Sequence, residues 1–194
     1  MRTTLASILA AALLAACGSH HDKATSGGTT TPGESTSGTV APGGKRAAAV
    51  MVGTKGHESV KGTVTFEEKD GKVVVTANIS GLTAGDHGFH IHEKGDCSAP
   101  DATSAGGHFN PSGHPHGAPD ATAHHEGDLG NLTAGADGNA NKSITLDDVA
   151  IGDGSPKDIV GKGFIIHDKA DDFTTQPTGN AGARIACGVI TAQQ

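Results

Sequence analysis

Two histidines separated by a single residue stand in the segment Gly88-Phe89-His90-Ile91-His92. In a β-strand, residues i and i+2 point to the same face, so His90 and His92 would present their ring nitrogens to one point. Phe89 and Ile91 would then enter the core. Imidazole is the commonest protein metal ligand and suits copper and zinc. The pair therefore predicts one side of a metal site.

More histidines follow at spacings that fit such a site. His108 precedes Phe-Asn-Pro, His116 precedes Gly-Ala-Pro, and His125 stands three residues before Asp128. Three imidazoles and one carboxylate form a sensible tetrahedral zinc set. His167 lies at the end of an expected strand. The chain has 12 histidines, and this abundance outside its N-terminal part favours metal binding over a set of unrelated surface residues.

Four other histidines have plainer interpretations. His57 is read as a solvated polar residue. His87 would point away from His90 and His92 if the strand geometry already holds there. His114 and His124 fall inside the histidine-rich segment and are not expected to bind metal.

The strongest local pattern covers residues 60–79, where apolar and polar residues alternate on both sides of Lys69-Asp70-Gly71. This pattern predicts a β-hairpin with one buried face. Asp137-Gly138 is a second hairpin-type turn signal. Further strands are expected at residues 88–93, 143–146, 159–167 and 184–190. No segment carries a convincing helical stripe, so an all-β antiparallel sandwich or barrel is expected.

Two segments do not follow the strand rhythm. Residues 94–126 are rich in Gly, Pro and His and nearly free of aliphatic side chains, and residues 168–183 form a second such loop. Long loops in a compact domain are usually functional or disordered. Metal ligation can organise a loop that has no core of its own, which would account for the first loop.

The N-terminal part reads differently from the rest. Residues 1–16 are typical of a secretory signal peptide, and Leu-Ala-Ala-Cys ending at Cys17 resembles a bacterial lipobox. The alternative is an ordinary signal peptide with an incidental cysteine. Residues 17–46 read as a flexible Ser/Thr/Gly/Pro-rich tether. Within it, His20 and His21 are read as a solvated tail or as weak metal scavengers. Residues 47–194 are long enough for one domain.

Composition narrows the function classes. The formal net charge is −7, and loss of Arg2 with residues 1–16 would make it −8. The chain has no Trp or Tyr. An acidic chain without basic clusters or these aromatic rings argues against nucleic acid as a partner. If Cys17 carries lipid, Cys97 and Cys187 remain as one pair, and an even remainder in an exported protein suggests a disulfide.

Taken as a set and in this order, the motifs resemble copper/zinc superoxide dismutase over residues 47–191. They are His90-x-His92, Gly106-Gly107-His108-Phe109-Asn110-Pro111, His116-Gly117-x-Pro119, His125-x-Gly127-Asp128-Leu129-Gly130, His167-x-Lys169-Ala170-Asp171-Asp172, Gly179-Asn180-Ala181-Gly182-x-Arg184 and Ala186-Cys187-Gly188-Val189-Ile190. The resemblance implies an eight-stranded antiparallel Greek-key β-barrel or sandwich with two long functional loops, an architecture of which this family is an example.

The resemblance also implies roles for individual residues. Copper would be bound by His90, His92, His108 and His167, and zinc by His108, His116, His125 and Asp128. Histidine 108 would bridge the two metals and take part in catalysis. Asp171 would orient one copper ligand and one zinc ligand through their free N–H groups. Arg184 would guide the anion, and Cys97 would pair with Cys187.

The implied activity is the disproportionation of superoxide to dioxygen and hydrogen peroxide at the copper centre, protecting the cell envelope. Zinc has no redox chemistry and would be structural. The alternative is a copper/zinc storage or delivery lipoprotein without dismutase activity. We expect an exported protein, lipid-anchored through Cys17 to a membrane and facing the periplasm or the outer cell surface, that could form a homodimer. One departure is that residues 168–183 are short for a charge-guiding loop.

Overall fold

The computed structural model describes residues 44–194. The predicted signal peptide (1–16), Cys17, His20 and His21 lie outside the described residues. Strand β1 begins at Arg46, the last residue of the predicted tether. No helix within the described part of the chain has the length and apolar character needed to cross a bilayer.

The described residues form nine strands and one short 3-10 helix. The strands are β1 Arg46–Gly53, β2 Lys61–Lys69, β3 Lys72–Ser80, β4 Gly85–His92, β5 Asp128–Ala134, β6 Ala140–Leu146, β7 Gly163–His167, β8 Arg184–Val189 and β9 Thr191–Gln193, and the helix η1 is Thr103–Ala105. Each pair of hydrogen-bonded strands is antiparallel.

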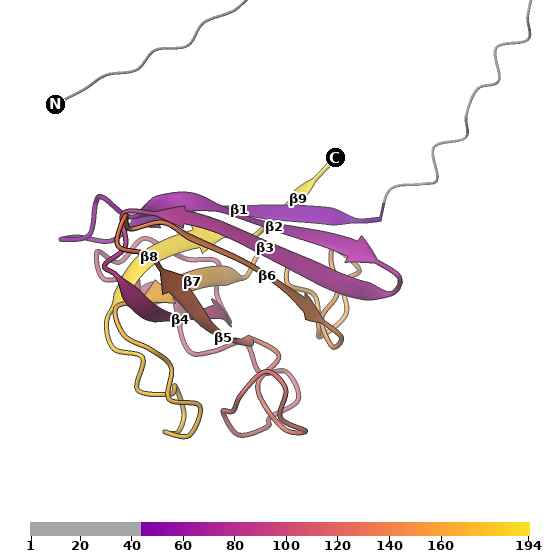
Figure 1. Ribbon diagram of the computed structural model, residues 1–194. Helices are drawn as coiled ribbons and strands as arrows, with labels where there is room; N and C mark the ends of the chain where they lie inside the picture. Colours follow the sequence, from indigo (N-terminus) through magenta and orange to yellow (C-terminus); the bar gives the residue numbers. More distant parts are fainter. Residues whose placement is uncertain (1–43) are drawn as a thin grey trace, which may run out of the picture. The chain divides into compact units, whose positions relative to one another are not determined.

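The strands follow one path in the order β5-β4-β7-β8-β1-β2-β3-β6, and β9 adds to β1 (Figure 1). The two ends of the path, β5 and β6, are consecutive in the chain and are joined by the turn at residues 135–139. This arrangement nearly closes the sheet into an eight-stranded barrel. The predicted all-β Greek-key fold is confirmed, and β9 is the one strand beyond the eight.

The predicted hairpin is present as β2 and β3. Its turn consists of Asp70 and Gly71, both with positive φ (53° and 76°), as a two-residue type I′ turn requires. The alternating residues fill the core, with Val64 and Phe66 of β2 and Val75 of β3 at most 1% exposed. The turn chemistry and the period-two pattern therefore agree on one register.

Three of the expected strands differ at their ends. The strand expected at 159–167 begins only at Gly163, because residues 159–162 form a turn in which the Lys162 N–H donates to the Ile159 carbonyl. Gly161 in this turn has a φ of 82°, which an extended strand does not allow. The strands expected at 88–93 and 184–190 end one residue early, at His92 and Val189.

The barrel places the long loops together. Figure 1 shows the 168–183 loop and the salmon-coloured part of the 93–127 loop extending from the same side of the barrel, beneath β4 and β5. Strand β4 lies between β5 and β7, and its Phe89 and Ile91 pack in the core. The residues that alternate with them, His90 and His92, are also fully buried.

Candidate metal centres

Four histidines from distant parts of the chain converge beside β4. Their ligand nitrogens all lie within 4.8 Å of one another, and all four residues are buried: His90, His92, His108 and His167. β4 supplies the first two, the 93–127 loop supplies the third, and the end of β7 supplies the fourth. We call these residues the four-histidine cluster.

Each of these rings has one nitrogen without a hydrogen-bond partner among the described residues. These atoms are His90 Nδ1, His92 Nε2, His108 Nε2 and His167 Nε2. A buried polar nitrogen without a partner is unfavourable unless something else binds it. Four such nitrogens directed at one another are the donor set that a metal ion with imidazole ligands requires, so the cluster fits a metal ion.

The opposite nitrogen of three of these rings faces an acceptor. His90 Nε2 donates to Asp171 Oδ2 at 2.7 Å. His92 Nδ1 donates to the Gly106 carbonyl at 3.0 Å, and His167 Nδ1 donates to the Gly182 carbonyl at 3.2 Å. These acceptors fix the tautomer of each ring and leave the inward nitrogen free to bind an ion.

A second cluster shares His108 with the first. It consists of His108, His116, His125 and Asp128, all buried. The distances from Asp128 Oδ1 to the three Nδ1 atoms are 2.8, 3.0 and 3.3 Å. In a tetrahedral site with bonds of about 2.0–2.1 Å, neighbouring ligand atoms lie roughly 3.3 Å apart. The second cluster is therefore close to tetrahedral dimensions.

Histidine 108 belongs to both clusters through different atoms. Its Nδ1 lies 2.8 Å from Asp128 Oδ1 in the second cluster. Its unpartnered Nε2 belongs to the four-histidine cluster. Among the described residues, His108 is thus the one side chain that could touch two ions.

Burial and charge set the protonation of the clusters. Burial lowers the pKa of His108 to about 4 and that of His167 to about 3, so both rings are neutral near pH 7. Burial also lowers the pKa of His116, but Asp128 and Asp171 outweigh it and raise this pKa to about 9. Burial opposes ionisation of Asp128, yet hydrogen bonds from three imidazoles hold its pKa well below the usual range.

A carboxylate connects the two clusters from outside. Asp171 Oδ2 accepts from His90, and Oδ1 accepts from His116 Nε2 at 2.9 Å. The backbone of Asp171 is held in turn by Asn131 of β5. Asn131 Nδ2 donates to the Asp171 carbonyl at 2.9 Å, and the Asp171 N–H donates to Asn131 Oδ1 at 2.7 Å.

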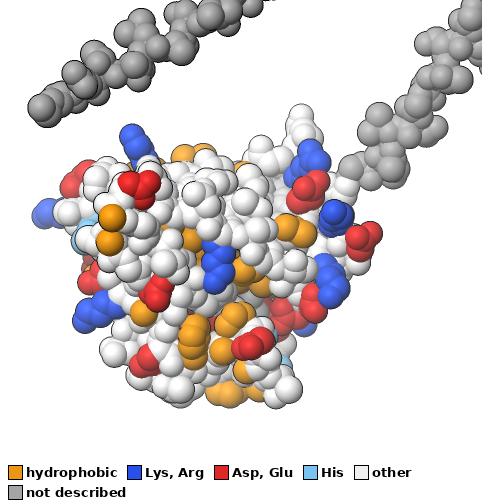
Figure 2. Space-filling model, viewed as in Figure 1, with side chains coloured by type: hydrophobic (Ala, Val, Ile, Leu, Met, Phe, Trp, Pro, Cys, Tyr) orange, Lys and Arg blue, Asp and Glu red, His pale blue; other side chains and the backbone are white. Residues whose placement is uncertain are grey.

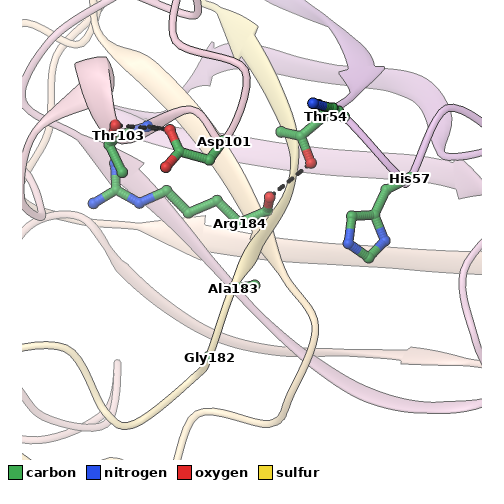
Figure 3. Close-up of a pocket in the computed structure, with 8 residues that line it drawn as sticks. Thr54, His57, Asp101, Thr103, Gly182, Ala183 and Arg184 are labelled. Atoms are coloured by element: carbon green, nitrogen blue, oxygen red, sulfur yellow. Dashed lines mark hydrogen bonds between the residues drawn. The ribbon is translucent and has the colours of Figure 1, made fainter.

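Arg184 is the first residue of β8 and lines a cavity near the four-histidine cluster (Figure 3). It donates to the Ala102 carbonyl at 2.8 Å and to the Gly106 carbonyl at 2.6 Å. The Gly106 carbonyl also accepts from His92, so one backbone oxygen joins Arg184 to the four-histidine cluster. A cavity of about 280 Å³ borders this arginine and is lined by Thr54, Lys55, His57, Asp101, Thr103, Gly182, Ala183 and Arg184.

The predicted disulfide is present between Cys97 and Cys187, with Cα atoms 5.8 Å apart. It connects the 93–127 loop to β8. This joins the loop that carries Ala102 and Gly106 to the strand that begins with Arg184.

Every residue that the family resemblance assigns to copper or zinc lies in one of the two clusters. The four histidines expected not to bind metal, His57, His87, His114 and His124, lie in neither. His87 is nevertheless buried, and its Nδ1 donates to the His167 carbonyl at 2.7 Å.

Of the residues that position the clusters, Asp171 was predicted from the sequence, whereas three others were not. Gly106, Asn131 and Gln176 act through backbone or amide groups. A signal was available for Asn131, which directly follows the Gly127–Gly130 segment of a recognised motif. Gln176 carried no such signal.

Two comparisons with known proteins agree with this geometry. The sequence model of the family described as copper/zinc superoxide dismutase (SODC) matches residues 60–190. Among solved structures, the chain is similar to one described as "Crystal Structure Analysis of the clock protein EA4". The two share 40% sequence identity with a TM-score of 0.68, over 76% of this chain and 94% of that one.

Proposed function

The chain belongs to the copper/zinc superoxide dismutase family, and from this premise we propose that it disproportionates superoxide to dioxygen and hydrogen peroxide. The observation that carries the proposal is the shared His108. Its Nδ1 lies in the second cluster and its Nε2 in the four-histidine cluster. A storage protein needs ligands, but it does not need one ring between two sites.

The donor sets support an assignment of metals. Four neutral imidazole nitrogens suit copper, so we assign copper to His90, His92, His108 and His167. Three imidazoles and one carboxylate suit zinc, so we assign zinc to His108, His116, His125 and Asp128. When bound, copper would supply one-electron redox chemistry, and zinc would supply a fixed positive charge next to His108.

The chain's own residues supply binding, orientation and protons. Arg184 has five N–H donors and spends two of them on the Ala102 and Gly106 carbonyls. The others remain for a small anion in the cavity that Arg184 lines. Disproportionation consumes two protons for each peroxide formed, and His108 Nε2 is a buried nitrogen that can hold one of them. Asp171 holds His90 and His116 in place meanwhile.

The deciding experiment measures metal content and superoxide consumption on the same preparation of the mature chain. We expect one copper and one zinc per chain and catalytic consumption of superoxide. His167→Gln removes one assigned copper ligand and should abolish the activity. The matched control is His114→Gln, a loop histidine outside both clusters, which should keep it. Stoichiometric metal without dismutation would contradict the proposal and favour storage or delivery.

We further propose that the protein is exported and held at a membrane by lipid on Cys17, so that it protects the cell envelope from superoxide. The disulfide between Cys97 and Cys187 supports an oxidising compartment. Radiolabelled palmitate should enter the chain and be absent from Cys17→Ser. Lack of label on the parent chain would contradict the lipid anchor and indicate an ordinary secreted enzyme. Whether the protein forms a homodimer is tested separately by measuring the mass of the particle in solution, which should be twice the mass of one chain for a dimer.

A further inference from the structure

Gln176 of the 168–183 loop makes two hydrogen bonds to the backbone of a single residue in the other long loop. Its Nε2 donates to the His116 carbonyl at 2.8 Å. The His116 N–H donates to Gln176 Oε1 at 2.8 Å. One side-chain amide thus satisfies both backbone groups of His116, as a neighbouring strand would.

The same loop also holds the ring of His116. Asp171 Oδ1 accepts from His116 Nε2 at 2.9 Å, and Asp171 is itself fixed to β5 through Asn131. The 168–183 loop therefore contacts the backbone and the ring of His116 from two points, five residues apart. The remaining nitrogen, Nδ1, faces the second cluster.

The two hydrogen bonds of Gln176 attach the exposed segment 174–177 to the rest of the domain. Gln176 and its neighbours at 174, 175 and 177 are exposed. Within the loop, the Gly179 N–H donates to the Thr175 carbonyl at 2.7 Å, and the Asp172 N–H donates to the Gly179 carbonyl at 2.9 Å. Such exposed local turns are weak by themselves. The hydrogen bonds of Gln176 to the buried residue His116 restrict the motion of these turns.

We propose that Gln176 is a positioning residue that couples the order of the 168–183 loop to the ion held by His116. An ion on Nδ1 would immobilise His116 and so fix the backbone groups that Gln176 binds. A loop held by Gln176 would keep His116 in place and so retain the ion. Coupling of this kind is reciprocal. The inference rests on the proposed zinc site but not on dismutase activity.

The first test measures zinc retention. Gln176→Met keeps the length of the side chain and removes both hydrogen bonds. On the protein loaded with copper and zinc, we expect zinc transfer to a chromophoric chelator to become about tenfold faster, the size set by loss of two ordinary hydrogen bonds. Copper content should stay the same. The control Thr174→Ala changes an exposed residue of the same loop whose hydroxyl bonds only Asp172, and it should match the parent.

The second test separates coupling from simple weakening of the loop. Amide hydrogen exchange at Gly179 and Asp172 is followed with and without zinc. Zinc should slow exchange at both amides in the parent and in Thr174→Ala, and much less in Gln176→Met. Zinc release within twofold of the parent, or unchanged protection by zinc in Gln176→Met, would overturn the proposal. Neither readout uses superoxide, so a lack of dismutase activity would leave the inference standing.

Discussion

The chemistry at the residue scale depends on which nitrogen of each ring faces inward. His90 directs Nδ1 toward the cluster, whereas His92 and His167 direct Nε2. The choice follows from the acceptor behind each ring, which is a carboxylate for His90 and a backbone carbonyl for the other two. Because an acceptor fixes the tautomer, the ligand geometry is set by residues that would never touch the metal.

Arg184→Ala should lower kcat/KM for superoxide about ten- to a hundredfold, a range typical of removing one steering or stabilising charge. The salt dependence of the rate should weaken as well, because a fixed positive charge is lost. Copper and zinc content should not change, since the guanidinium binds carbonyls rather than imidazoles. Stopped-flow decay of superoxide at several ionic strengths measures both effects. Unchanged turnover would remove Arg184 from the anion's path.

Zinc binding should release about one proton between pH 6.5 and 8 and progressively less as the pH passes 9. In the metal-free protein the pKa of His116 is raised to about 9, so its ring carries a proton that zinc must displace from Nδ1. Apparent zinc affinity should therefore rise about tenfold per pH unit and level off above pH 9. Titration calorimetry in buffers of different ionisation enthalpy counts the proton. Affinity that stays constant from pH 7 to 9 would contradict this protonation.

At the scale of elements, the two long loops are held by the barrel at a few defined points. The disulfide connects the 93–127 loop to β8, and the Lys55 N–H, in the β1–β2 turn, donates to the Pro100 carbonyl at 2.9 Å. Asn131 of β5 holds Asp171 in the 168–183 loop. These cross-connections supplement the packing of Ala102, Ala105 and Phe109 of the 93–127 loop, which are buried against the barrel.

Replacing both Cys97 and Cys187 with alanine should destabilise the fold by about 2–5 kcal/mol, the usual effect of losing a native disulfide. Activity should fall further than unfolding alone explains, because the loop that presents Ala102 and Gly106 to Arg184 loses its tie to β8. Thermal unfolding measures the loss of stability. The value of kcat/KM, measured well below the midpoint temperature of unfolding, measures the loss of activity in the folded protein. If kcat/KM is unchanged, the β1–β2 turn alone suffices to hold that loop.

The elements that could be predicted are those whose residues carry a local pattern. The β2–β3 hairpin has alternating β-branched residues and an Asp-Gly turn, and both are local signals. Strands β1 and β5 have Ala-, Gly- and Asn-rich sequences, Arg46–Gly53 and Asp128–Ala134, which have little intrinsic preference for strands. They are strands because their neighbours pair with them, and pairing partners cannot be read from a short window.

The site divides in the same way. His90, His92 and the loop histidines could be predicted because short motifs fix both residue type and order. Gln176 could not, because its role depends on where residue 116 lies in space, 60 positions away. The backbone carbonyls of Gly106 and Gly182 could not be predicted either, since any residue has a carbonyl. The groups that position each ligand are brought together by loop packing, which cannot be read from a single sequence.

At the scale of the whole molecule, net charge opposes the proposed substrate. The chain carries −7, and Figure 2 shows basic and acidic side chains interspersed over the visible face. An anion must therefore be drawn in by a local field. Electrostatic steering, for which superoxide dismutases are a known example, acts through charges lining the cleft. Here Lys55 borders the same cavity as Arg184 and comes from the β1–β2 turn, not from the 168–183 loop.

Lys55→Glu should therefore lower kcat/KM about two- to fivefold at low ionic strength, a modest part of the steering range. The loss should shrink as salt rises, because the Debye length falls from about 30 Å at 0.01 M to about 10 Å at 0.1 M. The matched control is Lys69→Glu, the same charge change at the far end of β2. Eight residue steps along a strand span roughly 26 Å, so its effect should be smaller at every salt concentration. Equal losses for the two variants would mean that net charge, rather than the field at the Arg184 cavity, controls the approach of the anion.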